Sequence, residues 1–577
     1  MTRNSATLKR DKLAAKLVHC GEVLRGSILQ RTTFHSSGCP KCVRGEGHPQ
    51  WVLNVNYPGA KTRQLSLRPG QVPQVRKALQ RYRQAKETLE GNQRAEPIFV
   101  AAGPGPVQGR QVVIAARRLQ RSFADGLIAE EVQDLWEPWM RHADEALNDD
   151  QLLQIIQQEL SKRYKKSKTR GRPGTPADVV LRMLLLKHMR GWSYEDVTRE
   201  VRANLVYREF TGVGGGKVPD DKTMGRLARQ LGPEAIEQLH QRTVAIAVEK
   251  KVVAGRKMRV DTTVVETNIH YPTDSTLMGD GVRVLIRVMK KVAAVVGEVG
   301  TKFRDRSRSV KRRVVEIAYA SRDKSEKGQQ KMKVAYGKLL EATSRVVGQA
   351  KKFSTEIAGK VKKGQRVVLQ KARQQLDEMI PRVQQVMQQT RTRVLEGNTR
   401  AKNKLLSVFE PDTELIRKGK ASKPTEFGKM VKIQEAENQI VIHCEVFDQR
   451  PSDSDLLTPS IEKHKELLGR VPVLATADAG FFSAANEAAA KQLGVKRVAV
   501  PSRSTKSEKR KQEQKKRWFK KAQKWRTGCE GRISVLKRRH GLNRSRYKGV
   551  PGVKRWVGLG VIADNMINIG LHLAGRR

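Results

Sequence analysis

The sequence predicts a mixed α/β protein whose sheet-forming segments are separated by a long helical insertion. Residues 257–267 are β-branched and strand-like, and strand signals return at 427–433 and 439–447. Helix and strand patterns then alternate to residue 500, which is typical of a layered α/β fold. Between these parts, residues 281–408 are highly charged, contain one proline and repeat apolar residues at helical spacing. We expect two or more long helices there, packed against one another.

Positive charge is the strongest compositional signal. The 577 residues carry a formal net charge of +56, of which residues 281–410 hold +21 and residues 501–550 hold +16. Clusters of Lys and Arg bind nucleic acid by neutralising its phosphates, so nucleic acid is the expected partner.

Other classes are disfavoured. No stretch approaches the ~18 uninterrupted apolar residues of a membrane span, and the N-terminus runs into charged residues instead of an apolar signal core. Five cysteines in a chain of this length do not make a disulfide scaffold. We therefore expect a soluble cytoplasmic protein without a membrane partner.

Residues 1–110 are predicted to form a separate small α+β domain of unknown role. Helical spacing covers 8–24 and 75–89, and strand-like runs cover 51–57 and 62–67. Residues 103–106 (Gly-Pro-Gly-Pro) are typical of a linker.

Cys39 and Cys42 have the two-residue spacing of half a zinc site. His35, His48 or Cys20 could complete the ligand set; the alternative is a pair of free thiols in a turn. Zn²⁺ is therefore one candidate cofactor of this region.

A helical region follows. Residues 111–175 are interpreted as linker and helices, including the basic segment 165–176, and residues 176–250 as a helical DNA-binding domain. Ser193 is placed to cap one helix, and residues 219–223 open another. Short helices with tight turns favour a helix-turn-helix-like unit, although bundles that bind no DNA have the same pattern.

Three acidic residues lie at positions where an active site could form. Asp261 and Asp478 lie in or just after predicted strands, and ligands of α/β sheets gather at strand ends. Glu530 lies on a basic helix predicted from about 510 to 540, where Arg526 and Lys537 share its face.

Converging carboxylates repel one another unless a cation lies between them. Mg²⁺ is held by a few carboxylates plus water and phosphates, and two such ions can clamp the attacking and leaving oxygens of a phosphoryl displacement. The three acids therefore indicate a site that cleaves phosphodiesters.

From about residue 170 onward the sequence resembles bacterial insertion-sequence transposases of the DDE type, close to the ISNCY-like group. Residues 181–197 and 219–223 resemble the N-terminal DNA-binding region of that family, and 260–268 and 476–481 match its first and second Asp motifs. Arg526, Glu530, Lys537 and the run 541–544 match the signature around the third acid.

The resemblance implies an RNase H-like catalytic core split between residues 251–280 and 409–577, with 281–408 inserted. It implies two Mg²⁺ or Mn²⁺ ions on Asp261, Asp478 and Glu530, cleavage at terminal inverted repeats and strand transfer into target DNA. Phosphates would be held by Arg526, Lys537, Arg538 and Arg544, and the protein would act as a homodimer or larger oligomer at the bacterial nucleoid.

The sequence departs from the family in two places. Gln523 and Trp525 stand where many relatives have a Tyr before the Arg of the last signature. Residues 1–110 are not part of the usual transposase; they resemble a small uncharacterised bacterial domain with the Cys39, Cys42 and His48 signature.

Several alternatives remain open at this point. Glu266 and Asp274 compete with Asp261, and Glu508 and Glu513 compete with Glu530. The protein could also be a metal-dependent nuclease that does not join strands, or a noncatalytic DNA-binding protein derived from a transposase. A tyrosine recombinase is disfavoured because its Arg and His groups would all lie in the single run 538–547.

Overall fold

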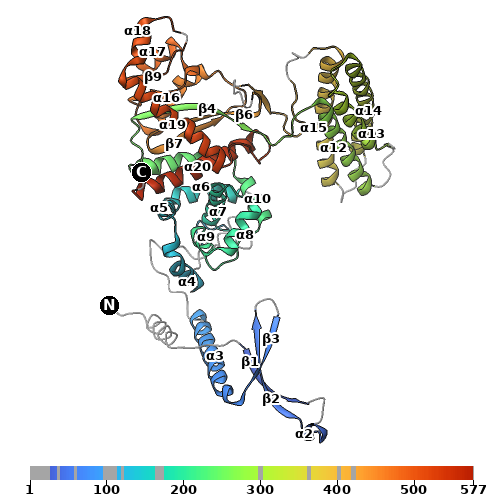
Figure 1. Cartoon of the computed structure of the whole chain (residues 1–577), viewed down its shortest axis with the longest axis vertical. Helices are drawn as coiled ribbons and strands as arrows, with labels where there is room; N and C mark the ends of the chain where they lie inside the picture. The colour runs from blue at the N-terminus through green and yellow to red at the C-terminus, as the bar shows by residue number, and fades with distance from the viewer. Residues whose placement is uncertain are drawn as a thin grey trace. The chain divides into compact units, whose positions relative to one another are not determined.

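A computed structural model describes most of the chain (Figure 1). The chain divides into two compact units, residues 1–109 and 110–577. The described residues are 26–34, 39–57, 61–94, 114–118, 123–162, 174–296, 303–359, 366–398, 404–417, 424–503 and 505–575.

The described residues of the first unit form a three-stranded antiparallel sheet with one long helix. The sheet order is β1-β2-β3, and Trp51 of β2 lies 5.0 Å from the guanidinium of Arg76 on α3. The described strands and helices are β1 (Gly26–Thr33), α2 (Pro40–Val43), β2 (His48–Tyr57), β3 (Lys61–Leu67), η1 (Pro69–Gln71) and α3 (Val72–Arg94).

Both strands and the second helix predicted in this unit are confirmed, while β1 was not predicted. The helix predicted at 8–24, the linker at 103–106 and nearly all of the basic segment 165–176 lie outside the described residues.

The second unit is built around a mixed sheet. Strand β4 is antiparallel to β6 on one side and parallel to β8 on the other, β9 continues the parallel part, and β5 and β7 both pair with β6. The mixed α/β class is therefore confirmed. The strands are β4 (Lys257–Glu266), β5 (Glu414–Ile416), β6 (Glu426–Glu435), β7 (Val441–Val446), β8 (Leu474–Thr476) and β9 (Arg497–Ala499).

Helices cover both faces of this sheet. Alternation along β4 places Met258 and Val260 in one apolar cluster with residues of α16 and α17, and Val265 in another with residues of α19 and α20. The helices that follow the sheet strands are α16 (Leu457–Leu468), α17 (Ala484–Gln492), α18 (Glu508–Lys515), α19 (Arg517–Arg539) and α20 (Gly549–Leu573), with short turns η4 (Glu437–Gln439), η5 (Asp453–Leu456) and η6 (Ala479–Phe481).

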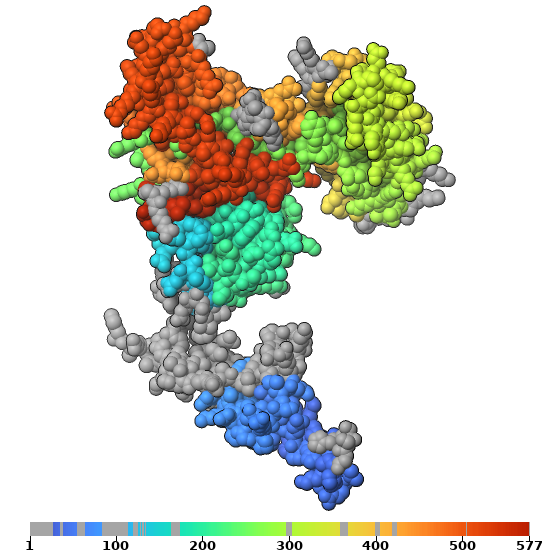
Figure 2. Space-filling model, viewed as in Figure 1, coloured from blue at the N-terminus to red at the C-terminus, as the bar shows by residue number. Residues whose placement is uncertain are grey.

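The helices before β4 pack onto the C-terminal helix. Residues 177–189 of α7 are buried throughout, and Leu559, Ile562 and Met566 of α20 belong to the same core. In Figure 2 the surface of these helices, in cyan and blue-green, adjoins the red surface of the C-terminal part of the chain. The Ser193 cap is confirmed, since its Oγ accepts a hydrogen bond from Asp196 N at 3.0 Å. These helices are α4 (Phe123–Val132), η2 (Gln133–Leu135), α5 (Pro138–Leu147), α6 (Asp150–Ser161), α7 (Ala177–Arg190), α8 (Tyr194–Ala203), α9 (Leu205–Phe210), α10 (Asp221–Gln230) and α11 (Pro233–Glu249).

The insertion between β4 and β5 is a helical bundle with its own core (Figure 1). Its helices bury one face against one another, including Phe353 and Leu339 of the longest helix, while Pro381 lies inside α15. The elements are α12 (Asp274–Val296), α13 (Ser307–Ala320), α14 (Glu326–Gly359), α15 (Arg366–Thr390) and the π-turn η3 (Arg391–Leu395).

The long basic helix predicted from about 510 to 540 is two helices. Lys516 has an extended backbone (φ −58°, ψ 143°), so α18 ends at Lys515 and α19 begins at Arg517. Of the helices described, none has both the length and the apolar character needed to cross a membrane.

Candidate active site

Asp261 lies within β4, and Asp478 follows the end of the neighbouring parallel strand β8. The β4–β8 register ends at the pair Arg259–Thr476, and Asp261 and Asp478 each follow two residues later. Asp478 is still extended (φ −77°, ψ 176°) and caps η6, with its Oδ1 accepting from Gly480 N at 2.9 Å. Both side chains are partly exposed. The sheet therefore brings two residues that are 217 positions apart to equivalent places along neighbouring segments of the chain.

The third acid, Glu530, is linked to Asp261 through the side chain of Arg526. Arg526 of α19 lies with Nη2 2.8 Å from Glu530 Oε1 and Nη1 3.8 Å from Asp261 Oδ2. Its side chain is 13% exposed, whereas Glu530 is 59% exposed. One guanidinium thus spans the space between a strand carboxylate and a helix carboxylate.

The donor set is one that Mg²⁺ accepts. It consists of carboxylate oxygens that are partly open to water, and the positively charged guanidinium of Arg526 lies between those of Asp261 and Glu530. In the described part of the chain Asp261, Asp478 and Glu530 do not form a group with all ligand atoms within 4.8 Å of one another. Glu530 is exposed and is held by its ion pair with Arg526.

A buried ion pair fixes α19 against the sheet. Arg259, two residues before Asp261 on the same face of β4, donates to Glu435 Oε2 at 2.9 Å and to the Trp525 carbonyl at 2.5 Å. Its guanidinium also lies 4.7 Å from the Trp525 ring. Burial raises the pKa of Glu435, and Arg259 opposes that rise. The residue before Arg526 is therefore held to β4 by its backbone and its ring.

Two further contacts fix the same helix. Gln523 donates to Thr476 Oγ1 at 3.1 Å, which joins α19 to the strand that leads to Asp478. Near the other end, Arg532 forms a buried ion pair with Asp564 of α20 at 2.6 Å. Burial raises the pKa of the Cys529 thiol, and the charges of Glu435 and Asp261 raise it further.

Gly528 gives a test of this packing. A Cβ at Gly528 would lie 2.3 Å from Arg259 Nη1, which Glu435 and Trp525 hold in place. We expect Gly528→Ala to lower the thermal midpoint of the protein, although alanine favours helix by about 1 kcal/mol over glycine. The matched control is Gly531→Ala in the same helix, where a Cβ would meet nothing within 4 Å. Gly531→Ala should raise the thermal midpoint or leave it unchanged. Equal effects of the two variants would show that Gly528 is not packed against Arg259.

A fourth carboxylate, not predicted from the sequence, lies beside this site. Asp453 of η5 accepts a hydrogen bond from Thr262 Oγ1 at 2.9 Å. A Cβ at Gly480 would be 3.2 Å from Asp478 Oδ1 and 3.4 Å from Asp453 Oδ2, so the two carboxylates flank this glycine. The sequence signal is weak, because Asp453 and Thr262 are 191 residues apart.

The rival acids have other partners. Glu266 pairs with Arg544 at 3.1 Å, and Asp274 is buried in the insertion beside Arg393. On α18, Glu508 pairs with Lys511 and Glu513 with Lys516, both on the basic surface.

The remaining predicted phosphate contacts are at the end of α19 and beyond it. Lys537 and Arg538 lie in its last turn, with Arg538 exposed. Arg544 is half exposed, and its backbone segment pairs with the end of β4 through Ser545 N and the Glu266 carbonyl at 2.7 Å.

A cavity of about 490 Å³ adjoins this segment. Lys187 of α7 is 2% exposed, and its Nζ lies 4.5 Å from the Trp556 ring and 5.0 Å from the Tyr194 ring. Burial lowers the pKa of Lys187 to about 7. The cavity combines cations, amides and aromatic rings: Lys187, His188, Gly191, Trp192, Glu266, Asn268, His540, Gly541, Asn543, Arg544, Arg546 and Trp556.

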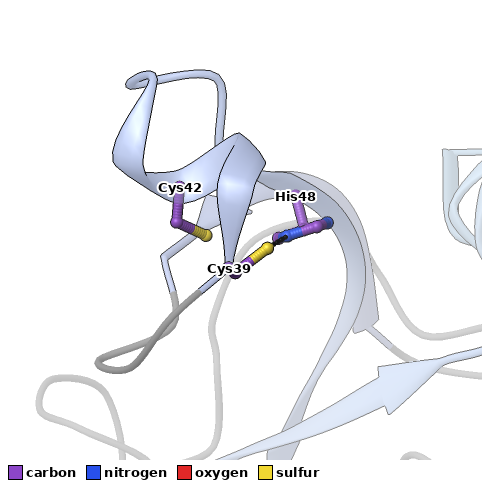
Figure 3. A group of neighbouring side chains, drawn as sticks. All are labelled: Cys39, Cys42 and His48. Carbon is purple, nitrogen blue, oxygen red and sulfur yellow. Dashed lines mark hydrogen bonds between the residues drawn. The ribbon is translucent and has the colours of Figure 1, made fainter.

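The predicted zinc ligands lie in the first unit. Cys39 and Cys42 gather with His48 (Figure 3), whereas His35 and Cys20 are outside the described residues.

Comparison with known families agrees with this layout. Residues 139–230, which span α5 to α10, match a transposase domain family (DUF772), and residues 487–569, which include Arg526, Glu530 and Lys537, match a transposase DDE domain. These two matches show that two segments of the chain are similar to transposase domains, the second of them a DDE domain. They confirm the resemblance to insertion-sequence DDE transposases.

Among curated proteins, an uncharacterized protein of Rhizobium meliloti, ORF8 in the nfe locus, is 29% identical over 127 residues. The match covers 21% of this chain and 61% of that protein. No solved structure shows significant similarity to the chain.

Proposed function

We propose that this protein is a DDE transposase that cleaves DNA at the terminal inverted repeats of its element and joins the ends to target DNA. The observation that carries the proposal is the contact of Arg526 with both Asp261 and Glu530, beside the parallel strand that delivers Asp478. The transposase role rests on the two domain matches.

In this proposal Asp261, Asp478 and Glu530 hold Mg²⁺ or Mn²⁺. Bound divalent ions would activate the attacking oxygen and stabilise the leaving oxygen of an in-line displacement. Asp261 and Asp478 are fixed by the sheet, so they set the position of the site. Glu530 is exposed and closes the ligand set, while Arg526, released from it, can turn its guanidinium to a DNA phosphate.

An RNase H-like core, with its mixed sheet between helices, is part of the proposal. Support comes from three antiparallel strands (β7, β6, β4), two parallel strands (β8, β9) and helices on both faces. The helical insertion enters this core between β4 and β5 and carries positive charge that could position DNA through phosphates without reading sequence.

The proposal is tested with DNA that carries the flanks of the gene. Purified protein, Mg²⁺, labelled end fragments and a target plasmid should give both end cleavage and joined products. Cleavage without joining would support the metal-dependent nuclease instead. DNA binding without either product would support a noncatalytic binding protein.

We further propose that α10 reads the inverted repeats. Its N-terminus is capped by Asp220, whose Oδ1 accepts from Thr223 N at 2.7 Å, and it exposes Lys222, Arg226 and Arg229. By contrast α7, with residues 177–189 buried, is not available to a groove of DNA.

Replacing Lys222, Arg226 and Arg229 with alanine should weaken binding to end DNA more than to random DNA. Wild-type affinity should fall steeply with salt, and the removal of each cation that neutralises a phosphate should reduce the slope of log K against log salt by about 0.9. Binding titrations at several salt concentrations measure both effects.

A matched variant on the insertion, with Arg308, Lys311 and Arg312 of α13 changed to alanine, should weaken binding to both DNAs equally. An unchanged preference for end DNA in the α10 variant would exclude α10 as the reading element.

A further inference from the structure

Three potential ligand atoms meet in the small first unit, whereas the acids considered above belong to the second. The Cys39 and Cys42 sulfurs and a His48 ring nitrogen all lie within 4.8 Å of one another, and Cys39 Sγ is 3.0 Å from His48 Nε2 (Figure 3). Ligands on tetrahedral zinc, with Zn–S near 2.3 Å and Zn–N near 2.0–2.1 Å, are themselves roughly 3.3–3.8 Å apart. The three ligand atoms therefore lie near the spacing of zinc ligands before any ion is added.

The backbone around these residues is built to bring them together. Cys39 immediately precedes α2 and Cys42 lies in it, so one helical turn places both sulfurs on the same side. His48 begins β2, where it is registered with Thr33 of β1, and Thr33 Oγ1 donates to the His48 carbonyl at 3.1 Å. The histidine is thus fixed by the sheet and the cysteines by the turn that precedes it.

Two glycines make the turn from α2 to β2. Gly45 and Gly47 have φ of +80° and +54°, a left-handed backbone that glycine adopts without strain. A Cβ at Gly47 would also lie 2.3 Å from Thr32 Cγ2, so the chain is pressed against β1 directly before His48. This turn between α2 and β2 places His48 beside Cys39 and Cys42.

A metal at this place would add to the apolar packing of the unit. Of its described residues, the buried apolar ones include Val52, Leu53, Val72 and Leu79. Small domains commonly gain stability from a structural metal in addition to their core.

We propose that Cys39, Cys42 and His48 bind Zn²⁺, which fastens the α2 turn to the start of β2 and stabilises the first unit. These residues supply three ligands, and the fourth position is available to water or another group. A Cys39–His48 pair acting as a nucleophile would use the same short contact, but it has no need of a second sulfur at two-residue spacing. The inference does not depend on the proposed transposase activity.

The test uses the full-length protein, purified without added metal and analysed for zinc by mass spectrometry. We expect about one Zn²⁺ per chain, and Co²⁺ substitution should give the intense absorption of thiolate-bound tetrahedral cobalt. Cys39→Ser and Cys42→Ser should each reduce the zinc content at least tenfold. Cys444→Ser, a control in the second unit, and Asp261→Asn should leave it unchanged.

Two further measurements keep the test valid if a serine variant misfolds. His48→Cys, which offers three sulfurs, should retain zinc, whereas His48→Ala should lose it. Chelation of the wild-type protein should speed hydrogen exchange in residues 26–57 and leave α19 unchanged. A wild-type protein that takes up neither Zn²⁺ nor Co²⁺, or a Cys39→Ser/Cys42→Ser double variant that retains zinc, would overturn the proposal.

Discussion

Glu530→Gln is expected to reduce Mg²⁺-dependent cleavage of end DNA by on the order of 10³ or more while leaving DNA binding intact. A neutral amide keeps the size of the side chain but removes the negative charge that a divalent ion requires. Metal ions stabilise such transition states by several kcal/mol, and each 1.36 kcal/mol is a tenfold change in rate. Because Glu530 is 59% exposed, the change should not affect folding.

The matched control is Glu508→Gln on α18. Glu508 lies in the same basic region and is exposed, but it pairs with Lys511 and is far from Arg526 along the chain. Cleavage rates of the two variants are compared at saturating Mg²⁺ with labelled end DNA. If Glu530→Gln cleaves at the wild-type rate, Glu530 is not a metal ligand.

The second large effect is expected from breaking the buried pair of Arg259 and Glu435. Their side chains are 6% and 0% exposed, so Arg259→Met leaves a carboxylate in the core without its partner. Removal of one member of such a pair costs about 3–5 kcal/mol, and the double variant Arg259→Met/Glu435→Leu should recover much of it. Chemical denaturation, followed by hydrogen exchange in β4 and α19, measures the loss.

Arg312→Met in the insertion is the control for this experiment. Arg312 is 67% exposed and pairs with Glu316, and exposed pairs contribute little, about 0–1 kcal/mol. Equal stability of the Arg259→Met and Arg312→Met variants would show that the pair does not fix α19. In that case the Arg259–Glu435 pair would not explain the position of Arg526 and Glu530 relative to Asp261.

The local parts of the fold could be predicted from sequence because their causes are local. Ser193 satisfies the first backbone amides of α8, and alternation along β4 separates Met258 and Val260 from Val265. Strand β1 was missed because its apolar residues, Ile28 and Leu29, are adjacent instead of alternating. The break at Lys516 was missed because neither proline nor glycine marks it.

The sequence indicated the candidate acids, whose catalytic role stays a prediction, but not the contacts that fix the elements carrying them. The β4–β8 register places Asp261 and Asp478 at equivalent positions, and Arg526 joins Asp261 to Glu530. The contacts of Arg259 with Glu435 and of Thr262 with Asp453 join residues 176 and 191 positions apart. No local pattern reports such contacts, so the fourth carboxylate and the fixation of α19 required the three-dimensional structure.

The central claim is that Asp261, Asp478 and Glu530 bind the same divalent ions. Anomalous diffraction from crystals of the protein with end DNA and Mn²⁺ tests it directly. The expected result is a manganese peak about 2.1–2.3 Å from oxygens of Asp261 and Asp478, with Glu530 turned away from Arg526 towards the metal. Manganese bound elsewhere, with Glu530 still paired to Arg526, would contradict the claim.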